Sequence, residues 1–347
     1  MANLSELIRK MLQLCGVKNG DRVVLMTSHR YDEYYINFYR TVLNNLETDY
    51  VHMIIPPQAK QITYKDLDTR QLVLSRFNVD LLKNADFILN VREITRPPFP
   101  WASMYQPEFN EIISKTRWLD VMIEKPEINI PRLFPTEALI SRTIKGAEIL
   151  AKARNIKITS EAGTFLTMEN TKHYAHAQYG LADGLDLPCG EKHNWDNFGF
   201  GLVAFYPKLD SVNGTLILES GDYILKLQRD VVDPVKITFK DGYAKKIEGG
   251  FTAKLLQRWF DRWEDPEVYG VAHVGWGTHK EGAVWTDSLY FCVADAESYP
   301  GVMQIGVGAT SDRPSLGHCD IECRHCNIYL DNELIVKDGE IVNPQCS

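Results

Sequence analysis

The spacing of apolar residues changes once along the chain, near residue 150, and this change constrains the fold more than any other feature. Before that point, short apolar runs alternate with stretches of helical periodicity. A parallel sheet with helices on its faces gives this rhythm. Beyond residue 156, apolar and polar residues alternate, and Asp-Gly or Asp-Asn pairs separate the runs, as in antiparallel hairpins. The sequence therefore predicts α/β plus α+β architecture: a parallel-sheet α/β domain, then a mainly antiparallel β domain.

The expected elements follow from these runs. Strands are expected at 22–28, 50–56, within 82–91, at 117–123, and after residue 156 within 214–225, 234–250 and 327–342. Helices are expected at 33–47, 136–155 and 251–265. Because the helix at 136–155 stands between the two patterns, it is predicted to connect two domains, residues 1–150 and residues 151–347. A chain of 347 residues exceeds what one core usually fills, which also favours two domains.

Composition excludes several classes of function. The net charge of −8 and the lack of a basic stripe argue against nucleic-acid binding. No apolar run reaches the roughly 18 residues that span a bilayer, and the amphipathic N-terminus does not resemble a signal peptide, so a cytoplasmic protein without membrane contact is expected. The seven cysteines are odd in number and scattered, unlike a disulfide framework. No glycine-rich phosphate loop follows the early strands, so no dinucleotide site is indicated.

The segment "LGHCDIE" (316–322) is the most informative for chemistry. In a strand, residues two apart point to the same face, so His318 and Asp320 project together. His273 precedes Gly275 and Gly277 in "VYGVAHVGWGTH" (268–279) and offers a third ligand. Two imidazoles and one carboxylate suit the facial triad of non-haem Fe(II) oxygenases, although zinc hydrolases use a similar set. These residues predict a metal site in the second domain.

A rival metal site lies in the same segment. Cys319, Cys323 and Cys326, with His318 and His325, resemble a compact zinc cluster. The spacing is tight, but no second pair of ligands stands at the separation typical of structural zinc. Free buried thiols are common, so burial without a metal explains these cysteines as well.

Several segments together resemble the 2,5-dihydroxypyridine 5,6-dioxygenase family, which is related by fold to the aminopeptidase S/T metallopeptidases. The resemblance covers most of the second domain, and the first domain agrees only in general rhythm. It implies an Fe(II) cofactor, a small aromatic substrate together with O₂, and a homo-oligomer, a dimer or higher. The segments are 265–277, 316–336, "YGLAD" (179–183), "GTLILESGDYIL" (214–225) and "GGFTAKLL" (249–256).

Comparison with the peptidases favours a single metal. Those relatives hold two metals, and a glutamate of theirs corresponds to His273 here. A histidine of theirs corresponds to Gln304 in "GVMQIGVG" (301–308), and a neutral amide is a poor ligand for a second metal. The loss of both ligands agrees with a mononuclear centre.

The chain also departs from the dioxygenase pattern. A glutamate and a histidine of that pattern align with Gln178 and Asn197, and a further histidine with Tyr105. Neither amide acts as a general base near neutral pH, so we expect a substrate different from 2,5-dihydroxypyridine. His176 and His193, which lie in the same region with Glu191 and Asp196, are candidates for the missing proton transfer.

Other residues are expected to contact the substrate or to pack in the core. Aromatic side chains that could line a pocket are Trp195, Trp276, Trp285, Phe198 and Tyr105. Gln304 is also placed at the substrate. Arg324 is a candidate partner for a substrate carboxylate, with plain surface exposure as the other interpretation.

The sequence thus favours an Fe(II) dioxygenase that opens a hydroxylated N-heterocyclic or related aromatic ring. One alternative is a single-metal hydrolase in which a metal-bound water attacks an amide. The others are an Fe(II) oxygenase without ring cleavage and a non-catalytic binding protein.

Overall fold

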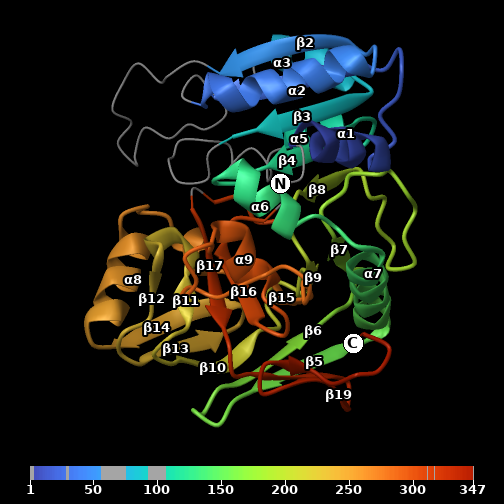
Figure 1. Cartoon of the computed structure of the whole chain (residues 1–347). Helices are drawn as coiled ribbons and strands as arrows, with labels where there is room; N and C mark the ends of the chain where they lie inside the picture. The colour runs from blue at the N-terminus through green and yellow to red at the C-terminus, as the bar shows by residue number, and fades with distance from the viewer. Residues whose placement is uncertain are drawn as a thin grey trace.

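The computed structural model describes residues 4–28, 31–55, 76–92, 107–310, 312–315 and 317–346. The first part of the chain forms a five-stranded parallel sheet in the order β2-β1-β3-β4-β8, drawn at the top of Figure 1. Its strands are β1 (Arg22–Ser28), β2 (Asp49–Ile55), β3 (Phe87–Val91), β4 (Arg117–Val121) and β8 (Trp195–Asn197).

Helices cover both faces of this sheet because its strands are apolar on both sides. Val23 and Leu25 of β1 pack in one cluster with α1 (Leu4–Leu14) and α2 (Glu33–Asn45). Val24 and Met26 face the other way, toward α3 (Arg76–Lys83) and α5 (Pro107–Ile113). The short α6 (Pro126–Arg132) contacts α1. The predicted α/β architecture of this part is confirmed.

The rest of the chain is mainly antiparallel, as predicted, and its strands form two sheets. One has eight strands in the order β14-β13-β10-β6-β5-β18-β19-β20. Its strands are β5 (Asn155–Thr159), β6 (Phe165–Glu169), β10 (Asn213–Leu218), β13 (Val235–Lys240), β14 (Tyr243–Gly249), β18 (Asn327–Leu330), β19 (Glu333–Lys337) and β20 (Glu340–Ile341). Asp-Gly and Asp-Asn pairs stand between β13 and β14 and between β18 and β19, as the pattern indicated.

The other antiparallel sheet has seven strands in the order β12-β11-β17-β16-β15-β9-β7 and carries the predicted metal ligands. Its strands are β7 (His176–Gln178), β9 (Leu202–Phe205), β11 (Tyr223–Ile224), β12 (Arg229–Asp230), β15 (Val271–Gly277), β16 (Met303–Gly308) and β17 (His318–Cys323). The helical elements in this part are α7 (Glu137–Lys152), η3 (Leu225–Leu227), α8 (Phe251–Asp261), η4 (Pro266–Tyr269) and α9 (Val293–Ser298).

The connecting helix is shorter than predicted, and the two parts are interleaved. The Thr136 side chain caps the start of α7, and β5 begins at Asn155, so the helix ends three residues before the predicted limit. β8 lies beyond residue 150 in sequence yet pairs with β4 of the parallel sheet. One continuous hydrophobic core joins Leu119 of that sheet to Val203 and Ile305 of the antiparallel part. The proposed division at residue 150 is therefore crossed by both pairing and packing.

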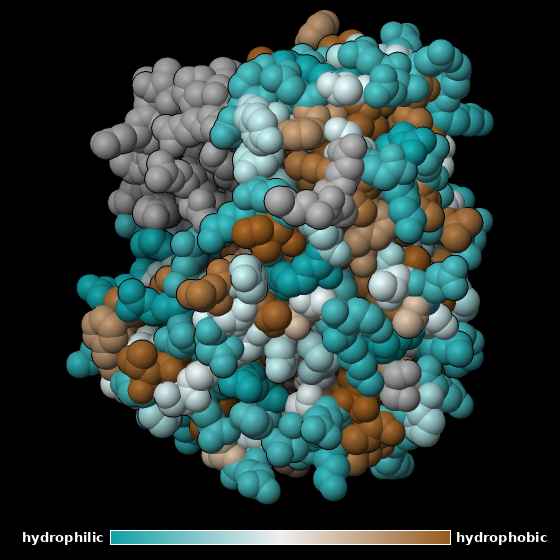
Figure 2. Space-filling model, in the orientation of Figure 1, coloured by the Kyte–Doolittle hydropathy of each residue, from teal (hydrophilic) through white to brown (hydrophobic). Residues whose placement is uncertain are grey.

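The described surface shows no large apolar region on the face drawn in Figure 2. On the face shown in Figure 2, apolar residues are scattered among hydrophilic ones. Among the described residues, none of the helices combines the length and apolar character that a bilayer span requires.

Candidate metal centre

Strand pairing brings His273 and Asp320 onto one line across the sheet. His273 of β15 pairs with Gly306 of β16, and Gly306 pairs with Asp320 of β17. His318 lies two residues before Asp320 on the same strand, so its side chain emerges on the same face. Two strands, β15 and β17, therefore present the three predicted ligands on one face of the seven-stranded sheet, on either side of β16.

The three side chains converge. One donor atom from each of His273, His318 and Asp320 lies within 4.8 Å of the other two. Nε2 of His318 is 2.8 Å from Oδ1 of Asp320, and Nε2 of His273 is 3.4 Å from the same oxygen. The two imidazole rings are nearly parallel, with centroids 5.2 Å apart. Among the described residues this is the one group of histidine, cysteine, aspartate or glutamate with such spacing.

A backbone carbonyl group orients the ring of His318, as is common for histidines that bind metals. Nδ1 of His318 lies 3.1 Å from the carbonyl oxygen of Ala309, so Nδ1 carries the proton and Nε2 keeps a lone pair. Oδ2 of Asp320 is buried and finds no hydrogen-bond partner among the described residues. A buried carboxylate oxygen without a donor is costly in a protein interior. A divalent cation would satisfy it, and the donor set fits one.

Gly306 makes room for this arrangement. A β-carbon at Gly306 would stand 2.3 Å from Cε1 of His273, much closer than atoms in contact approach. A register shift in β15 between Val271 and His273 adjusts where the histidine projects. The His273 ring therefore crosses the middle strand toward Asp320 because that strand has no side chain there.

Electrostatics favour the protonation states that a metal needs. Burial lowers the pKa of His273 to about 4, so its ring is neutral at physiological pH. Burial alone would raise the pKa of Asp320, but His318 and His273 beside it hold that pKa well below its usual range. The centre thus offers a neutral imidazole at His273 and a carboxylate at Asp320, as ligation requires.

A second acidic group lies next to the ligands. Gln304 pairs with Glu322 across β16 and β17, and its Nε2 donates a 2.6 Å hydrogen bond to Oε2 of Glu297 in α9. Burial, and then the charge of Asp320, raise the pKa of Glu297 to about 8. Burial and Glu297 raise the pKa of Glu322 well above its usual range. Burial and neighbouring negative charge therefore favour the protonated form of both acids.

Sequence reasoning missed this pair of acids. Glu322 follows Asp320 by two residues, so the same periodicity that placed His318 beside Asp320 could have found it. Glu297 lies in the stretch 292–298, all of it buried, where a glutamate is unusual.

Comparison with known proteins places the chain in a family. The family described as 2,5-dihydroxypyridine 5,6-dioxygenase matches residues 3–343. The chain belongs to this family. The resemblance predicted from the sequence is therefore confirmed, and it extends over the first domain as well.

Individual relatives agree with this assignment. A 2,5-dihydroxypyridine 5,6-dioxygenase of Pseudomonas putida is 27% identical over 363 positions, covering 99% of this chain and 97% of that protein. The structure of 2,5-dihydroxypyridine dioxygenase from P. putida KT2440 matches with a TM-score of 0.82 at 26% identity, covering 100% of this chain and 99% of the other. Wild-type AmpT from Thermus thermophilus shares the fold, with a TM-score of 0.65 at 13% identity over 98% of this chain and 99% of its own.

The expected replacements for the acid and base residues of the dioxygenase family are spread over two sheets. Gln178 is buried on β7, on the same face as His176. Asn197 lies on β8, where it pairs with Asp120 of the parallel sheet, and its Oδ1 has no partner among the described residues. Tyr105 lies outside the described residues.

His193 is fully buried beside two carboxylates. Nδ1 of His193 is 3.2 Å from Oδ1 of Asp183, and Nε2 is 3.2 Å from Oδ2 of Asp196. Asp196 also accepts hydrogen bonds from the backbone N–H groups of residues 179–181. Burial alone would lower the pKa of His193, but the carboxylates raise it to about 10. His193 is thus a buried cation that holds the "YGLAD" turn.

The aromatic residues and Arg324 lie mostly apart from the ligands. Trp276 is three residues from His273 on β15, so it projects from the opposite face and packs near Gly146 of α7. Trp195 donates from Nε1 to Asp120, and Phe198 packs against Phe134. Arg324 stacks over Trp285 at 5.2 Å. Of the predicted substrate-binding residues, Gln304 is the one that the structure brings next to the metal ligands.

The cysteines do not form the rival site. Cys319, Cys323 and Cys326 are buried and free, and no cysteine joins a group of three potential ligands among the described residues. Cys319 and Cys323 alternate with His318 and Asp320 along β17, so they face the opposite side of the sheet. His325 is exposed and lies 3.1 Å from Asp338. Packing, and not metal binding, accounts for these thiols.

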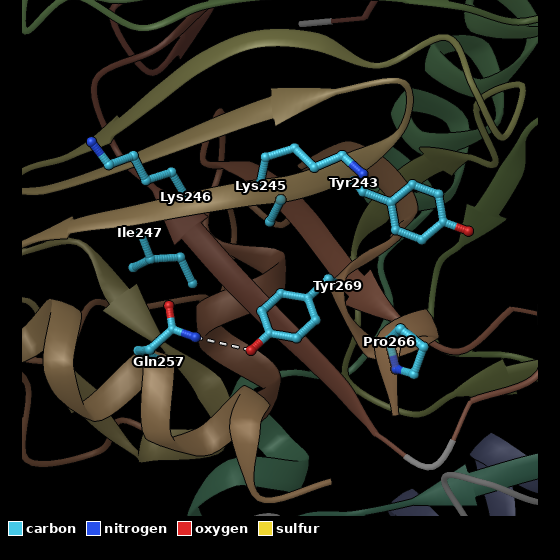
Figure 3. Close-up of a pocket in the computed structure, with 8 residues that line it drawn as sticks. Tyr243, Lys245, Lys246, Ile247, Gln257, Pro266 and Tyr269 are labelled. Atoms are coloured by element: carbon cyan, nitrogen blue, oxygen red, sulfur yellow. Dashed lines mark hydrogen bonds between the residues drawn. The ribbon is translucent and has the colours of Figure 1, made fainter. Parts of the chain in front are cut away.

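A surface pocket of about 410 Å³ lies elsewhere, between β14, α8 and η4 (Figure 3). Lys245, Lys246 and Tyr243 stand on one side of it, and Gln257 donates a 2.9 Å hydrogen bond to the hydroxyl of Tyr269 on the other. None of its lining residues belongs to the predicted site.

Proposed function

We propose that the chain is a mononuclear non-haem Fe(II) dioxygenase in which His273, His318 and Asp320 hold the iron. The convergence of two imidazole nitrogens and one carboxylate within 4.8 Å supports this proposal above all. Such a triad leaves coordination positions open, and bound Fe(II) would supply the activation of O₂. The unpartnered oxygen of Asp320 and the orientation of His318 by Ala309 support the same proposal.

The reaction we propose is the opening of a hydroxylated N-heterocyclic or related aromatic ring with O₂. Membership of the 2,5-dihydroxypyridine 5,6-dioxygenase family supports ring cleavage. Gln178 and Asn197 replace two acid and base residues expected from that family, which favours a substrate other than 2,5-dihydroxypyridine. The substrate is therefore expected to be a related ring with a hydroxyl group placed to reach the centre.

Access to the centre is one-sided. The side chains of His318 and Asp320 are at most 3% exposed, whereas that of His273 is 13% exposed. A substrate would therefore approach from the side of His273. On that side the ring of Tyr206 packs against His273, and the ring of His176 packs against Tyr206. The buried flank keeps water from the ligands and strengthens their electrostatic interactions.

Two other reactions remain as alternatives from the sequence. A single-metal hydrolase would use the same ligands with Zn²⁺ or Mn²⁺, and the resemblance to AmpT supports only the shared fold. An Fe(II) oxygenase without ring opening would also consume O₂. The predicted homo-oligomer stays a prediction.

The test is anaerobic purification with metal analysis, then an oxygen-electrode assay against hydroxypyridines and aminophenols. One iron per chain with substrate-dependent O₂ uptake is the expected result. A product that contains both oxygen atoms and an opened ring would separate ring cleavage from other oxygenation. Zinc or manganese without O₂ uptake would contradict the proposal and favour the hydrolase.

A further inference from the structure

His176 and Glu191 form a close hydrogen-bonded pair near the ligands. Nδ1 of His176 is 2.7 Å from Oε1 of Glu191, and Oε2 of Glu191 accepts a 2.9 Å hydrogen bond from the N–H of Ala177. A carboxylate so close to Nδ1 acts as the acceptor, so Nδ1 carries the proton. Nε2 of a neutral His176 then keeps its lone pair.

Aromatic rings connect this pair to the metal ligands. The ring of Tyr206 meets the ring of His176 edge-on at 5.1 Å and the ring of His273 edge-on at 6.4 Å. Burial dominates the lowered pKa of His273, and His176 is near enough to lower that pKa further. The side chain of His176 is 17% exposed and that of His273 is 13% exposed, so both are partly accessible to solvent.

Strand register places His176 closer to the ligands than Gln178. Ala204 pairs with both His176 and Gly275, whereas Leu202 pairs with both Gln178 and Gly277. The row of paired residues that contains His176 therefore crosses β15 two residues from His273. The row that contains Gln178 crosses β15 four residues from His273. This difference is about 7 Å along the strand. All these positions belong to one face of the sheet.

We propose that His176, held by Glu191, is the proton-transfer residue for the substrate hydroxyl in this catalytic centre. Glu191 is a positioning residue, because it acts through His176. The inference rests on the proposed function. It assigns to a histidine on β7 the role that Gln178 and Asn197 are chemically unable to perform.

The proton transfer conserves charge and electrons. Nε2 of neutral His176 accepts the proton of a substrate hydroxyl, and the O–H electron pair stays on the oxygen as a hydroxylate. The imidazolium that forms is paired with the Glu191 carboxylate. The proton then returns to the opened product or to water, so His176 ends neutral. No oxidant is needed for this step.

The groups that face His176 favour this role. Tyr174 has its hydroxyl 3.2 Å from Nδ1, and Tyr206 packs on the ring. Burial raises the pKa of both tyrosines far above neutrality, so neither competes as a base. Of the described groups that contact the His176 ring, Glu191 is the charged one.

The first experiment compares His176→Gln with the full-length wild type in iron content, kcat and KM across the same panel of hydroxypyridines and aminophenols. We expect iron to remain at one per chain and kcat to fall about 100-fold or more, with a smaller change in KM. Added imidazole should restore part of the activity of His176→Ala. Glu191→Gln should lower kcat about 10-fold. His173→Asn, which changes an exposed histidine in a left-handed conformation, is the matched control.

A second measurement does not depend on turnover. In full-length protein with ¹⁵N-labelled histidine and bound Zn²⁺, the His176 signal should report a proton on Nδ1, and Glu191→Gln should shift it. A proton on Nε2 of neutral His176, or wild-type kcat in His176→Gln, would overturn the inference. Absence of iron and of O₂ uptake in the wild type would instead overturn the proposed function.

Discussion

His273 and His318 direct their Nε2 atoms at the same oxygen of Asp320, at 3.4 Å and 2.8 Å. Burial lowers the pKa of His273 to about 4, so this ring is neutral at physiological pH and can present an Nε2 lone pair, as a metal ligand does. The arrangement is thus best satisfied by a cation that shares all three donors.

Replacing His318 with alanine should abolish iron binding. The variant loses one of two imidazoles and leaves Asp320 with a single nitrogen ligand nearby, and a triad reduced to two ligands does not hold Fe(II) tightly. Metal analysis after anaerobic reconstitution measures the effect. His325→Ala, which changes an exposed histidine just beyond the same strand, should keep one iron per chain. Stoichiometric iron in His318→Ala would contradict the assignment.

Replacing Gly306 with alanine should displace His273 and weaken iron binding. The added methyl group meets the imidazole at 2.3 Å, so the ring has to leave its position. Overpacking of this kind costs about 1–3 kcal/mol in unfolding free energy. Gly221→Ala is a useful comparison, because its β-carbon meets no atom within 4 Å while its φ of +94° strains the backbone. It should lose stability but keep iron, whereas equal iron affinity in both variants would refute this role for Gly306.

The local spacing of apolar residues was sufficient to predict much of the fold and part of the candidate site. The continuous apolar run 22–28 predicted β1 with the observed limits, and the two-residue period placed His318 and Asp320 on one face. The same rule applied to His273 and Trp276, three residues apart, would have put the tryptophan on the opposite face. These relationships depend only on neighbours along one strand.

Relationships that depend on pairing between distant segments were beyond sequence reasoning. β8 carries no pattern that indicates pairing with β4, whose paired residues lie 77 positions earlier, because three residues have no measurable period. Glu191 reaches His176 from a segment without regular structure. The shared face of His318 and Asp320 was therefore predictable from one strand, whereas the side chains around them required the register of the sheets.

The stability of the protein should depend on the charge of His193. The pKa of this histidine is about 10 in the folded protein, against an ordinary value near 6.5. A raised folded-state pKa contributes stability that is complete below pH 6.5 and is lost as the pH rises toward 10. The wild type should have a higher unfolding free energy than His193→Gln at low pH. We expect this difference between the two proteins to shrink over the window by an amount on the order of a few kcal/mol. Urea unfolding at pH 6.0, 7.5 and 9.0 measures it, and a constant difference would contradict the prediction.

Changing Cys323 and Cys326 together to serine should leave the iron in place. Both thiols are buried on the strand and turn that follow Asp320, and neither belongs to the ligand group. Burial of two hydroxyl groups should lower the melting temperature. The double alanine variant, which adds no polar atom, separates instability from metal loss. Iron missing from a folded alanine variant would support the cysteine cluster instead.

Changing Gln178 to glutamate should give weak activity on 2,5-dihydroxypyridine. A buried carboxyl group has a pKa nearer to neutrality and can accept a proton, which the amide is unable to do. The gain should be small, because position 178 lies about 7 Å farther along the strand from the ligands than His176. The assay is O₂ uptake with 2,5-dihydroxypyridine, and Gln178→Asn, a shorter amide, is the control. If an anaerobic titration of Gln178→Glu shows no binding of 2,5-dihydroxypyridine, the pocket differs from that of the relative in shape and not only in proton chemistry.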